Sequence, residues 1–332
     1  MPNHSDFSPF VADVIGRLGF WPYGEPEPVT GGTLNWNFGI ESEGERLFVR
    51  RYRDELKPAR IREEHALLRW VSERGIPAPV PYKTETDETV LSIAGGNWSV
   101  FPWVDGEVKE RGTLTAEQAG MLGVVHGATQ AVLAEHPASA GAGMWLTWSK
   151  DDSLALLAKV NDAARVAGAA DWMLDALKLQ ANLLEDTEVL PPAAFQSLPR
   201  QLLHGDFHVA QVLWDGDNIV AVTDWEVFRT DPRVWELVRS LAFSRLLDSP
   251  LATNYLHGYR RFIQLSEEEA RLGLRLWWQS RVVGLWAWQA YFLEGNQRAE
   301  QFLRATAAEL QRLDEPGWRE VVEERFVAAA CG

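Results

Sequence analysis

The sequence predicts an α+β fold with two parts, a small strand-rich N-terminal part and a larger, mostly helical C-terminal part. Over most of the first hundred residues, apolar side chains fall in short runs between glycine and proline turns, as they do in strands. From Thr115 onward they recur every three or four residues, as they do in helices. The 332 residues suffice for two such parts, since a domain usually holds about 100–200 residues. We expect an N-terminal lobe over 1–104 and a C-terminal lobe over 105–332.

The charge balance excludes several classes of partner. The chain has 32 Lys and Arg against 47 Asp and Glu, a formal net charge of −15. Because nucleic acids and anionic lipids are bound through basic patches, we expect neither as a partner. The opening residues are polar and no run of about 18 apolar residues occurs, which predicts a cytoplasmic protein without a membrane partner. Cys331 is the single cysteine, so no internal disulfide can form.

The residues of the N-terminal part predict four strands and one helix. The strand-like runs are 31–42, 45–54, 89–94 and 97–104. The first two flank a turn at Glu43-Gly44. Residues 59–75 place apolar side chains on one face and stop at Gly75, which predicts a helix. The proline-rich run 76–81 must be extended.

The C-terminal part should be helical around one hairpin. Helices are predicted over most of 150–195, 233–264 and 266–328. Thr115 with Gln118 has the pattern of a capping box, as do Ser266 and Glu269. The hairpin joins Gln211–Trp214 to Asn218–Thr223 through the turn Asp215-Gly216.

Residues 202–226 carry the candidate chemistry. Gln211 stands five residues after Asp206, and Asp224 stands thirteen residues after Gln211. A hairpin between them can bring the three side chains together. Two carboxylates and an amide oxygen are hard ligands that suit Mg²⁺ and phosphate rather than zinc or copper. Magnesium also brings its own positive charge, so a nucleotide is compatible with an acidic protein.

This layout is the one that kinases use: a catalytic Asp, a metal-binding amide five residues later and a downstream metal-binding Asp. Phosphoryl transfer requires an oriented acceptor hydroxyl and a neutralised phosphate charge. We therefore predict that Asp206 is catalytic and accepts the hydrogen bond, and then the proton, of the attacking hydroxyl. Asp224 is the predicted ligand of Mg²⁺, with Gln211 as a second, neutral ligand.

The segment resembles the aminoglycoside phosphotransferase/choline kinase superfamily, whose motif is roughly H-G-D-x-H-x-x-N followed by a strand and D-[FW]-[DE]. The matching residues are His204, Gly205, Asp206, His208, Asp224, Trp225 and Glu226. Gln211 stands where the family usually has Asn, and its extra methylene would deliver the amide oxygen at a different depth. Residues 231–237 resemble the family's D-P-x-x-D-L stretch, with Glu236 in place of Asp. The layout most resembles the homoserine-kinase-type and stress-response-kinase-type branches.

The resemblance extends into the N-terminal part and implies a bilobal, protein-kinase-like fold with a five-stranded antiparallel sheet. Residues 31–38 resemble the loop that covers the nucleotide, and 101–107 the hinge whose backbone receives adenine. The residues it implies for ATP binding are Asn35, Arg50, Glu64, Phe101 and Trp103. Among these, Arg50 matches a Lys that contacts the α- and β-phosphates, and Glu64 matches the helix glutamate that pairs with it.

Some residue assignments have local rivals. Arg51 competes with Arg50 for the phosphate contact, and Glu63 competes with Glu64. His208 is a candidate metal ligand or base, but we favour a ring that braces the catalytic loop, because no second His or Cys stands at ligand spacing. Trp277, Trp278, Trp286 and Trp288 fall on one helical stretch. They are expected in the core, or alternatively in an acceptor pocket for a substrate with an apolar or cationic face.

The resemblance implies an ATP-dependent phosphotransferase that moves the γ-phosphate to a hydroxyl of a small molecule, with ATP and Mg²⁺ as cofactors. Aminoglycoside, homoserine, choline and sugar acceptors all fit the motif, and no oligomeric state follows from it. A Ser/Thr protein kinase of the stress-response type would use the same catalytic residues on an open groove. A nucleotide-binding regulatory pseudokinase is the third possibility, because Gln211 and Arg50 each replace a metal- or phosphate-facing residue.

Overall fold

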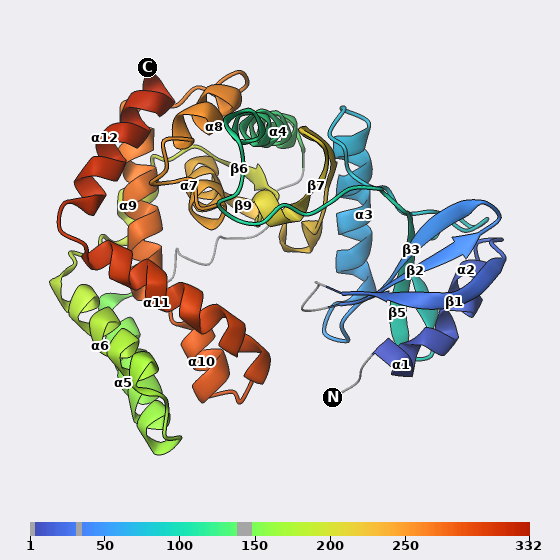
Figure 1. Ribbon diagram of the computed structural model, residues 1–332, viewed down its shortest axis with the longest axis horizontal. Helices are drawn as coiled ribbons and strands as arrows, with labels where there is room; N and C mark the ends of the chain where they lie inside the picture. Colours follow the sequence, from blue (N-terminus) through green and yellow to red (C-terminus); the bar gives the residue numbers. More distant parts are fainter. Residues whose placement is uncertain (1–3, 31–34, 138–147) are drawn as a thin grey trace.

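The computed structural model describes residues 4–30, 35–137 and 148–332. A strand-rich N-terminal lobe lies at one end of the molecule and a larger helical lobe at the other (Figure 1). The predicted α+β, bilobal fold is therefore confirmed. The helix α3 (Pro58–Ser72) stands between the sheet and the helical lobe (Figure 1) and corresponds to the helix predicted over 59–75.

The N-terminal sheet formed by the described residues has five antiparallel strands in the order β1-β2-β3-β5-β4. Their bounds are β1 (Pro22–Val29), β2 (Trp36–Ser42), β3 (Glu45–Arg51), β4 (Leu91–Ile93) and β5 (Gly96–Pro102). β2 and β3 form the expected hairpin around Glu43-Gly44. In the register of β2, β3 and β5, Asn37, Arg50 and Ser99 lie opposite one another and point to the face that α3 covers. The loop prediction for 31–34 falls outside the described residues.

The opposite face of the sheet is covered by N-terminal helices that the sequence did not predict. They are α1 (His4–Phe7), the 3₁₀ turn η1 (Ser8–Phe10) and α2 (Val11–Gly16). Val11 and Val14 of α2 are fully buried against Phe38 and Val49 of the sheet. Helices this short show less than two turns of apolar periodicity, so the pattern could not identify them.

The C-terminal lobe is helical, as predicted. Its helices are α4 (Ala116–Ala134), α5 (Lys150–Val166), α6 (Asp171–Asp186), α7 (Arg233–Phe243), α8 (Ala252–Tyr259), α9 (Glu267–Val283), α10 (Trp286–Phe292), α11 (Glu300–Asp314) and α12 (Trp318–Cys331), with 3₁₀ turns η3 (Pro192–Phe195) and η6 (Gln297–Ala299). The capping box before α4 is present, because the Thr115 hydroxyl accepts from the Gln118 N–H and the Gln118 side chain accepts from the Thr115 N–H. Trp277, Trp278 and Trp288 are buried core residues, whereas Trp286 is 51% exposed.

Two small sheets in this lobe carry residues 202–226. The predicted hairpin is present as β7 (Val212–Asp215) and β8 (Asn218–Val222). A second pair, β6 (Arg200–Leu203) with β9 (Arg229–Pro232), was not predicted, because each strand has only four residues. The connection from the N-terminal lobe is tied to the hairpin, since Glu107 and Trp214 exchange two backbone hydrogen bonds of 2.9 Å.

Across the described ranges, no helix is both long and apolar enough to cross a membrane.

Candidate active site

The turn before Asp206 requires a glycine. Gly205 has φ +91°, in the left-handed region, and a Cβ there would overlap the backbone carbonyl of Val227. Its N–H donates to Glu236 Oε1 at 2.5 Å. Glu236 is fully buried, and its other oxygen accepts from Gln130 at 3.0 Å. The loop is thus fixed from below by a buried carboxylate of α7.

The two motif histidines brace the loop. His204 Nε2 donates to the Thr223 carbonyl at 2.8 Å, and its Nδ1 accepts from the Asp206 N–H at 3.2 Å. His208 Nδ1 accepts from the Ala210 N–H at 3.1 Å and begins the 3₁₀ turn η4 (Val209–Gln211). Burial lowers the pKa of His208 to about 3, so its ring is neutral at physiological pH. These bonds agree with the bracing role that the spacing favoured.

The carboxylate of Asp206 is held from two sides. One oxygen accepts from Gln211 Nε2 at 3.1 Å, and the other makes an ion pair with Arg239 of α7. Burial raises the pKa of Asp206, but Arg239, together with His208 and His204, more than offsets burial, so the pKa lies below its ordinary value. Because the Gln211 amide nitrogen is used in this way, its Oε1 is the end that remains for a cation. Asp206 is therefore ionised and oriented.

Asp224 has different surroundings. It lies between β8 and the 3₁₀ turn η5 (Trp225–Val227) with φ 61°, and no hydrogen bond or ion pair engages its carboxylate within the described residues. Burial raises its pKa; Arg50 opposes this, while Glu226 and Asp206 raise the pKa further. The charge of Asp206 thus acts on Asp224, and that the two carboxylates form one catalytic site stays a prediction.

The donor set fits magnesium and does not form a complete protein cage. No group of three or more His, Cys, Asp or Glu side chains gathers at metal-binding distance in the described ranges. Mg²⁺ commonly takes one or two carboxylates from the protein and fills its other positions with phosphate oxygens and water. An Asp224 carboxylate that no other described residue engages is compatible with that pattern.

The structure separates the two rival arginines. Arg50 lies on the face toward α3, where its Nε donates to Asn37 Oδ1 at 3.2 Å. Burial lowers the pKa of Arg50, but carboxylates that include Asp224 and Glu64 raise it overall. Arg51 lies on the opposite face, 4.0 Å from the centre of the Phe7 ring, and is only 5% exposed. Arg50 is thus the arginine that shares an electrostatic environment with Asp224.

Glu64 is buried and has no partner for one of its oxygens. It is 2% exposed, and no hydrogen-bond partner of its Oε2 occurs in the described ranges. Burial raises its pKa to about 7, against an opposing effect of Arg50. The expected ion pair between Glu64 and Arg50 is not formed within the described residues, although each feels the other's charge. The rival Glu63 is exposed and pairs with Arg60 at 3.2 Å.

Asn35 connects the two lobes. Its Oδ1 accepts from the Arg53 N–H at 3.0 Å, and its Nδ2 donates to Glu226 Oε2 at 3.0 Å. Glu226 also makes an ion pair with the Arg53 side chain. The sequence identified Asn35 only as a nucleotide contact, whereas both ends of its amide are engaged within the protein. Glu226 is the last residue of the D-W-E motif, and its place in that motif was the sequence signal that it takes part in the site.

The two predicted hinge residues differ in exposure. Phe101 lies inside β5, 5% exposed, opposite Phe48 of β3. Trp103 is partly exposed and lies over Gly39, where a Cβ would come within 3.1 Å of its ring. The Arg46 guanidinium stacks on the same ring at 3.8 Å. The backbone N–H of Trp103 donates to the Arg46 carbonyl at 3.1 Å. The partly exposed ring of Trp103 can therefore contact a ligand, but the backbone N–H of Trp103 is already bonded to Arg46.

Arg239 is the residue that sequence reasoning missed. It lies on α7 among buried apolar neighbours such as Val238 and Leu241, and its side chain is only 16% exposed. A lone arginine on an apolar helix face was a signal, because a guanidinium is seldom buried without a charged partner.

An antiparallel N-terminal sheet beside a helical lobe, with Asp206 and Asp224 at the ends of one hairpin, defines the kinase-like class of phosphotransferases. The chain belongs to the phosphotransferase enzyme family, whose model matches residues 25–277, and it is an ATP-dependent phosphotransferase. No curated protein matches it.

Several solved structures share the fold at low sequence identity. A microcompartment-associated aminopropanol kinase is 17% identical with a TM-score of 0.62, covering 95% of this chain and 98% of that chain. An aminoglycoside phosphotransferase from Alicyclobacillus acidocaldarius is 15% identical with a TM-score of 0.61, covering 95% of each chain. A spectinomycin phosphotransferase in complex with ADP and spectinomycin is 14% identical with a TM-score of 0.58, covering 97% of this chain and 98% of that chain.

Proposed function

We propose that this protein transfers the γ-phosphate of ATP to a hydroxyl group of a small molecule, with Asp206 as the catalytic residue and Mg²⁺ held by Asp224 and Gln211. The observation that carries this proposal is the pair of carboxylates at the two ends of one hairpin. One is ionised and held by Arg239 and Gln211, and the other has no partner among the residues that the structure describes. An oriented acceptor for a proton and an unpartnered metal ligand are the two parts that phosphoryl transfer requires.

Asp206 would orient the acceptor hydroxyl by accepting its hydrogen bond, and would take its proton as the oxygen–phosphorus bond forms. Because Arg239 keeps the pKa of Asp206 low, the carboxylate is a weak base. A weak base suits a loose transition state, in which the hydroxyl keeps its proton until bond formation is advanced. Magnesium, when bound, would neutralise charge on the phosphates.

The N-terminal lobe would hold the nucleotide. Arg50 is the cation placed to contact the phosphates. We propose that Glu64 orients Arg50 once the nucleotide is present, because burial disfavours the charged form of Glu64 in the free protein. Trp103 would lie against the adenine ring. Because the Trp103 N–H is already bonded, the backbone of 104–106 would receive the adenine edge. The lobe boundary near residue 104 and the roles of Asn35 and Phe101 at the nucleotide belong to the same proposal.

A small acceptor is supported by the named relatives. The aminopropanol kinase and the spectinomycin phosphotransferase are named for small molecules, and the latter was solved with ADP. We extend that substrate class, and the use of ATP, to this chain.

The test compares wild-type protein with Asp206→Asn in ATP- and Mg²⁺-dependent transfer to a panel of hydroxylated metabolites. The expected result is a loss of about 10²–10⁴-fold in kcat, because the oriented base is removed, with ADP·Mg²⁺ binding retained. The control is Asp215→Asn, an exposed carboxylate in β7 of the same hairpin, which should transfer at the wild-type rate.

Two outcomes would contradict the proposal. Wild-type rates in Asp206→Asn would remove that residue from the catalytic role. Nucleotide binding that is independent of Mg²⁺, without transfer to any hydroxyl, would favour the regulatory pseudokinase.

A further inference from the structure

Arg239, which contacts Asp206, and Arg111 both lie over the Phe243 ring, with guanidinium carbons 4.3 and 5.3 Å from its centre. Three further arginines act electrostatically on these two, and we call the five the arginine cluster: Arg111, Arg229, Arg239, Arg245 and Arg281. After burial, the charges of Arg281 and Arg229 lower the pKa of Arg239, and Arg245 lowers that of Arg111. Arg239 therefore lies in the electrostatic field of Arg229 and Arg281, and Arg111 in that of Arg245, although the whole chain carries a net charge of −15.

Arg239 lies at the centre of this arginine cluster and is incompletely satisfied. One of its nitrogens contacts the Asp206 carboxylate, but its Nη1 is buried and has no hydrogen-bond partner in the described part of the chain. The guanidinium lies 4.3 Å from the centre of the Phe243 ring, which holds it flat. A buried N–H donor without an acceptor is costly, so this geometry has room for a further oxygen ligand.

Arg229 and Arg281 flank Arg239 and are held rigidly. Each stacks on a tryptophan, Arg229 at 5.1 Å from Trp235 and Arg281 at 4.8 Å from Trp277. Each also pairs with a carboxylate, at 2.6 Å for Asp231 and 3.3 Å for Glu309. These pairs neutralise two of the five charges, and the excess of positive charge comes from the others.

Arg111 and Arg245 supply that excess at the surface. With Val108, Lys109, Glu110 and Ala210 they line an open surface depression of about 360 Å³, a volume within the range of small-ligand sites. Ala210 directly precedes Gln211, so this depression borders the catalytic loop. Among the described residues, neither Arg111 nor Arg245 has a carboxylate within ion-pair distance. The charge of Asp206 raises the pKa of Arg111 against burial, which places the two in electrostatic contact.

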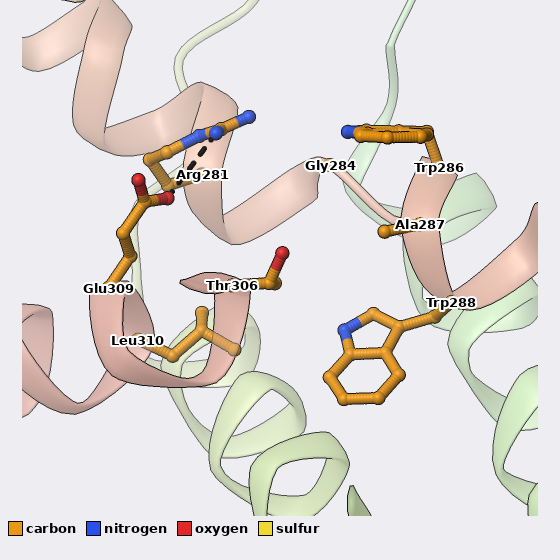
Figure 2. A pocket seen from close by; sticks show the side chains of 8 residues that line it. All are labelled: Arg281, Gly284, Trp286, Ala287, Trp288, Thr306, Glu309 and Leu310. Carbon is orange, nitrogen blue, oxygen red and sulfur yellow. Dashed lines mark hydrogen bonds and ion pairs between the residues drawn. The ribbon is translucent and has the colours of Figure 1, made fainter. Parts of the chain in front are cut away.

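A cavity beside Arg281 does not take part in this site. Figure 2 shows Arg281 of α9 reaching Glu309 of α11 above Thr306, with Trp286 and Trp288 on the other side. Its volume is about 10 Å³, which leaves room for one water at most.

We propose that the phosphate acceptor is an anion: a small hydroxylated molecule whose carboxylate or phosphate group is bound by the arginine cluster beside Asp206. This inference rests on the proposed phosphoryl transfer. Both groups match the planar fork of donors on a guanidinium. A local positive field would also draw an anion to an otherwise acidic protein, whereas a polycation such as an aminoglycoside would be repelled.

The nucleotide phosphates do not account for the cluster. Arg50 responds to Asp224, Glu64 and Glu226, all on the nucleotide side. Arg111 and Arg239 respond to Asp206 instead. Trp277 is buried beneath Arg281, which agrees with the core position favoured for it.

The experiment measures phosphoryl transfer from ATP·Mg²⁺ to acceptors that share a skeleton and differ in charge. One set is glycerate, glycerol and 3-amino-1,2-propanediol; the other is gluconate, glucose and glucosamine, with glucose 6-phosphate as the phosphate-bearing member. We expect kcat/KM at least about 10-fold higher for an acid than for its neutral counterpart, with the amine lowest, and a preference that weakens as salt is added. Gluconate against glucose 6-phosphate distinguishes a carboxylate from a phosphate.

Arg111→Gln and Arg245→Gln test whether the cluster causes the preference. Each should lower the ratio of acid to neutral kcat/KM by about 3- to 10-fold and leave the KM for ATP unchanged. The matched control is Arg304→Gln on α11, an exposed guanidinium that stacks on a tryptophan, Trp172, at 4.5 Å. It should leave the ratio unchanged.

The outcomes separate this inference from the proposed function. Transfer that prefers neutral or amine acceptors, or a ratio unaffected by either variant, overturns the anionic acceptor and leaves the kinase intact. If no acceptor is phosphorylated, thermal shifts in the presence of ADP·Mg²⁺ decide. Stabilisation by gluconate or glucose 6-phosphate that is lost in Arg111→Gln supports the inference, and equal shifts with glucose overturn it. A protein that does not bind ADP·Mg²⁺ at all contradicts the proposed function itself.

Discussion

The carboxylates at the two ends of the catalytic hairpin have opposite electrostatic surroundings. Asp224 lies among other acids, Glu226 and Asp206, so that its pKa is raised by burial and by their charge. Asp206 lies against Arg239, so that its pKa is lowered despite burial. The two aspartates therefore suit different partners. The acid-rich surroundings of Asp224 require a cation, and the arginine-rich surroundings of Asp206 have an excess of positive charge that can bind an anion.

This difference also divides the stability of the free protein. On the nucleotide side, Glu64 and Asp224 are buried with too little positive charge, so ionisation costs free energy until a ligand binds. On the acceptor side the ionised form of Asp206 is the favoured one. Replacing a carboxylate with an amide should therefore stabilise the protein on the nucleotide side and destabilise it on the acceptor side. Measuring both effects is the most direct test of this difference.

The largest effect is expected from Asp224→Asn. Loss of the charged metal ligand should reduce kcat by about 10³-fold or more, because an amide neutralises no charge on magnesium. The measurement is the rate of ATP-dependent transfer as a function of Mg²⁺ concentration. Asp215→Asn in the same hairpin is the control, and a normal Mg²⁺ dependence in Asp224→Asn would show that the metal is held elsewhere.

Glu64→Gln should stabilise the ligand-free protein at high pH. The pKa of Glu64 is about 7 in the folded chain and about 4.3 in an unfolded one. The folded state therefore binds the extra proton, and stability is lost as pH rises through 7. Gln imitates the protonated acid, so the variant should be more stable by up to about 3 kcal/mol at pH 8 and little changed at pH 4.

Urea unfolding at the two pH values measures this difference. Glu63→Gln, the exposed neighbour on α3, is the control and should alter the free energy of unfolding by no more than about 0.5 kcal/mol. A stabilisation of Glu64→Gln that is equal at both pH values would mean that the proton on Glu64 is not its cause.

Asp206→Asn should destabilise the protein, in contrast to Glu64→Gln. It leaves the buried Arg239 without a carboxylate, at a cost of about 1–3 kcal/mol at neutral pH. Because the folded pKa of Asp206 is depressed, the wild-type advantage is present above its unfolded pKa, about 4, and is lost as pH falls below that value. Urea unfolding from pH 7 to pH 3 should show the two proteins converging. Unchanged stability at pH 7 would mean that Arg239 gains nothing from Asp206.

What could be predicted from the sequence was what depends on spacing. The hairpin, the Thr115 capping box and the distance from Asp206 to Asp224 along the chain are local features, and local patterns determine them. The resemblance added the roles of residues far apart in sequence, such as Arg50 and Asp224. Their electrostatic interaction in the structure agrees with that placement.

What could not be predicted depends on which distant charges meet. Arg51 competed with Arg50 for the phosphate contact in the sequence, yet it is buried under α1, and Arg53 pairs with Glu226 across the lobes. The pairing of Arg239 with Asp206 depends on how α7 packs beneath the loop. No composition or periodicity encodes such a contact, and a net charge of −15 concealed a local excess of arginine.

The smallest effect should come from Glu226→Gln, which weakens the contact between the lobes. Glu226 accepts from Asn35 and pairs with Arg53, so its charge joins the C-terminal lobe to the nucleotide side of the N-terminal lobe. Losing that charge should cost about 1 kcal/mol, which corresponds to a rise of about 5-fold in the KM for ATP with kcat little changed. Arg62→Gln is the control, because its pair with Glu88 at 3.1 Å joins residues of one lobe only and should leave the KM unchanged. If kcat fell instead while the KM for ATP stayed constant, Glu226 would act on the reacting groups rather than on the contact between the lobes. The reaction would then depend on three carboxylates: Asp206, Asp224 and Glu226.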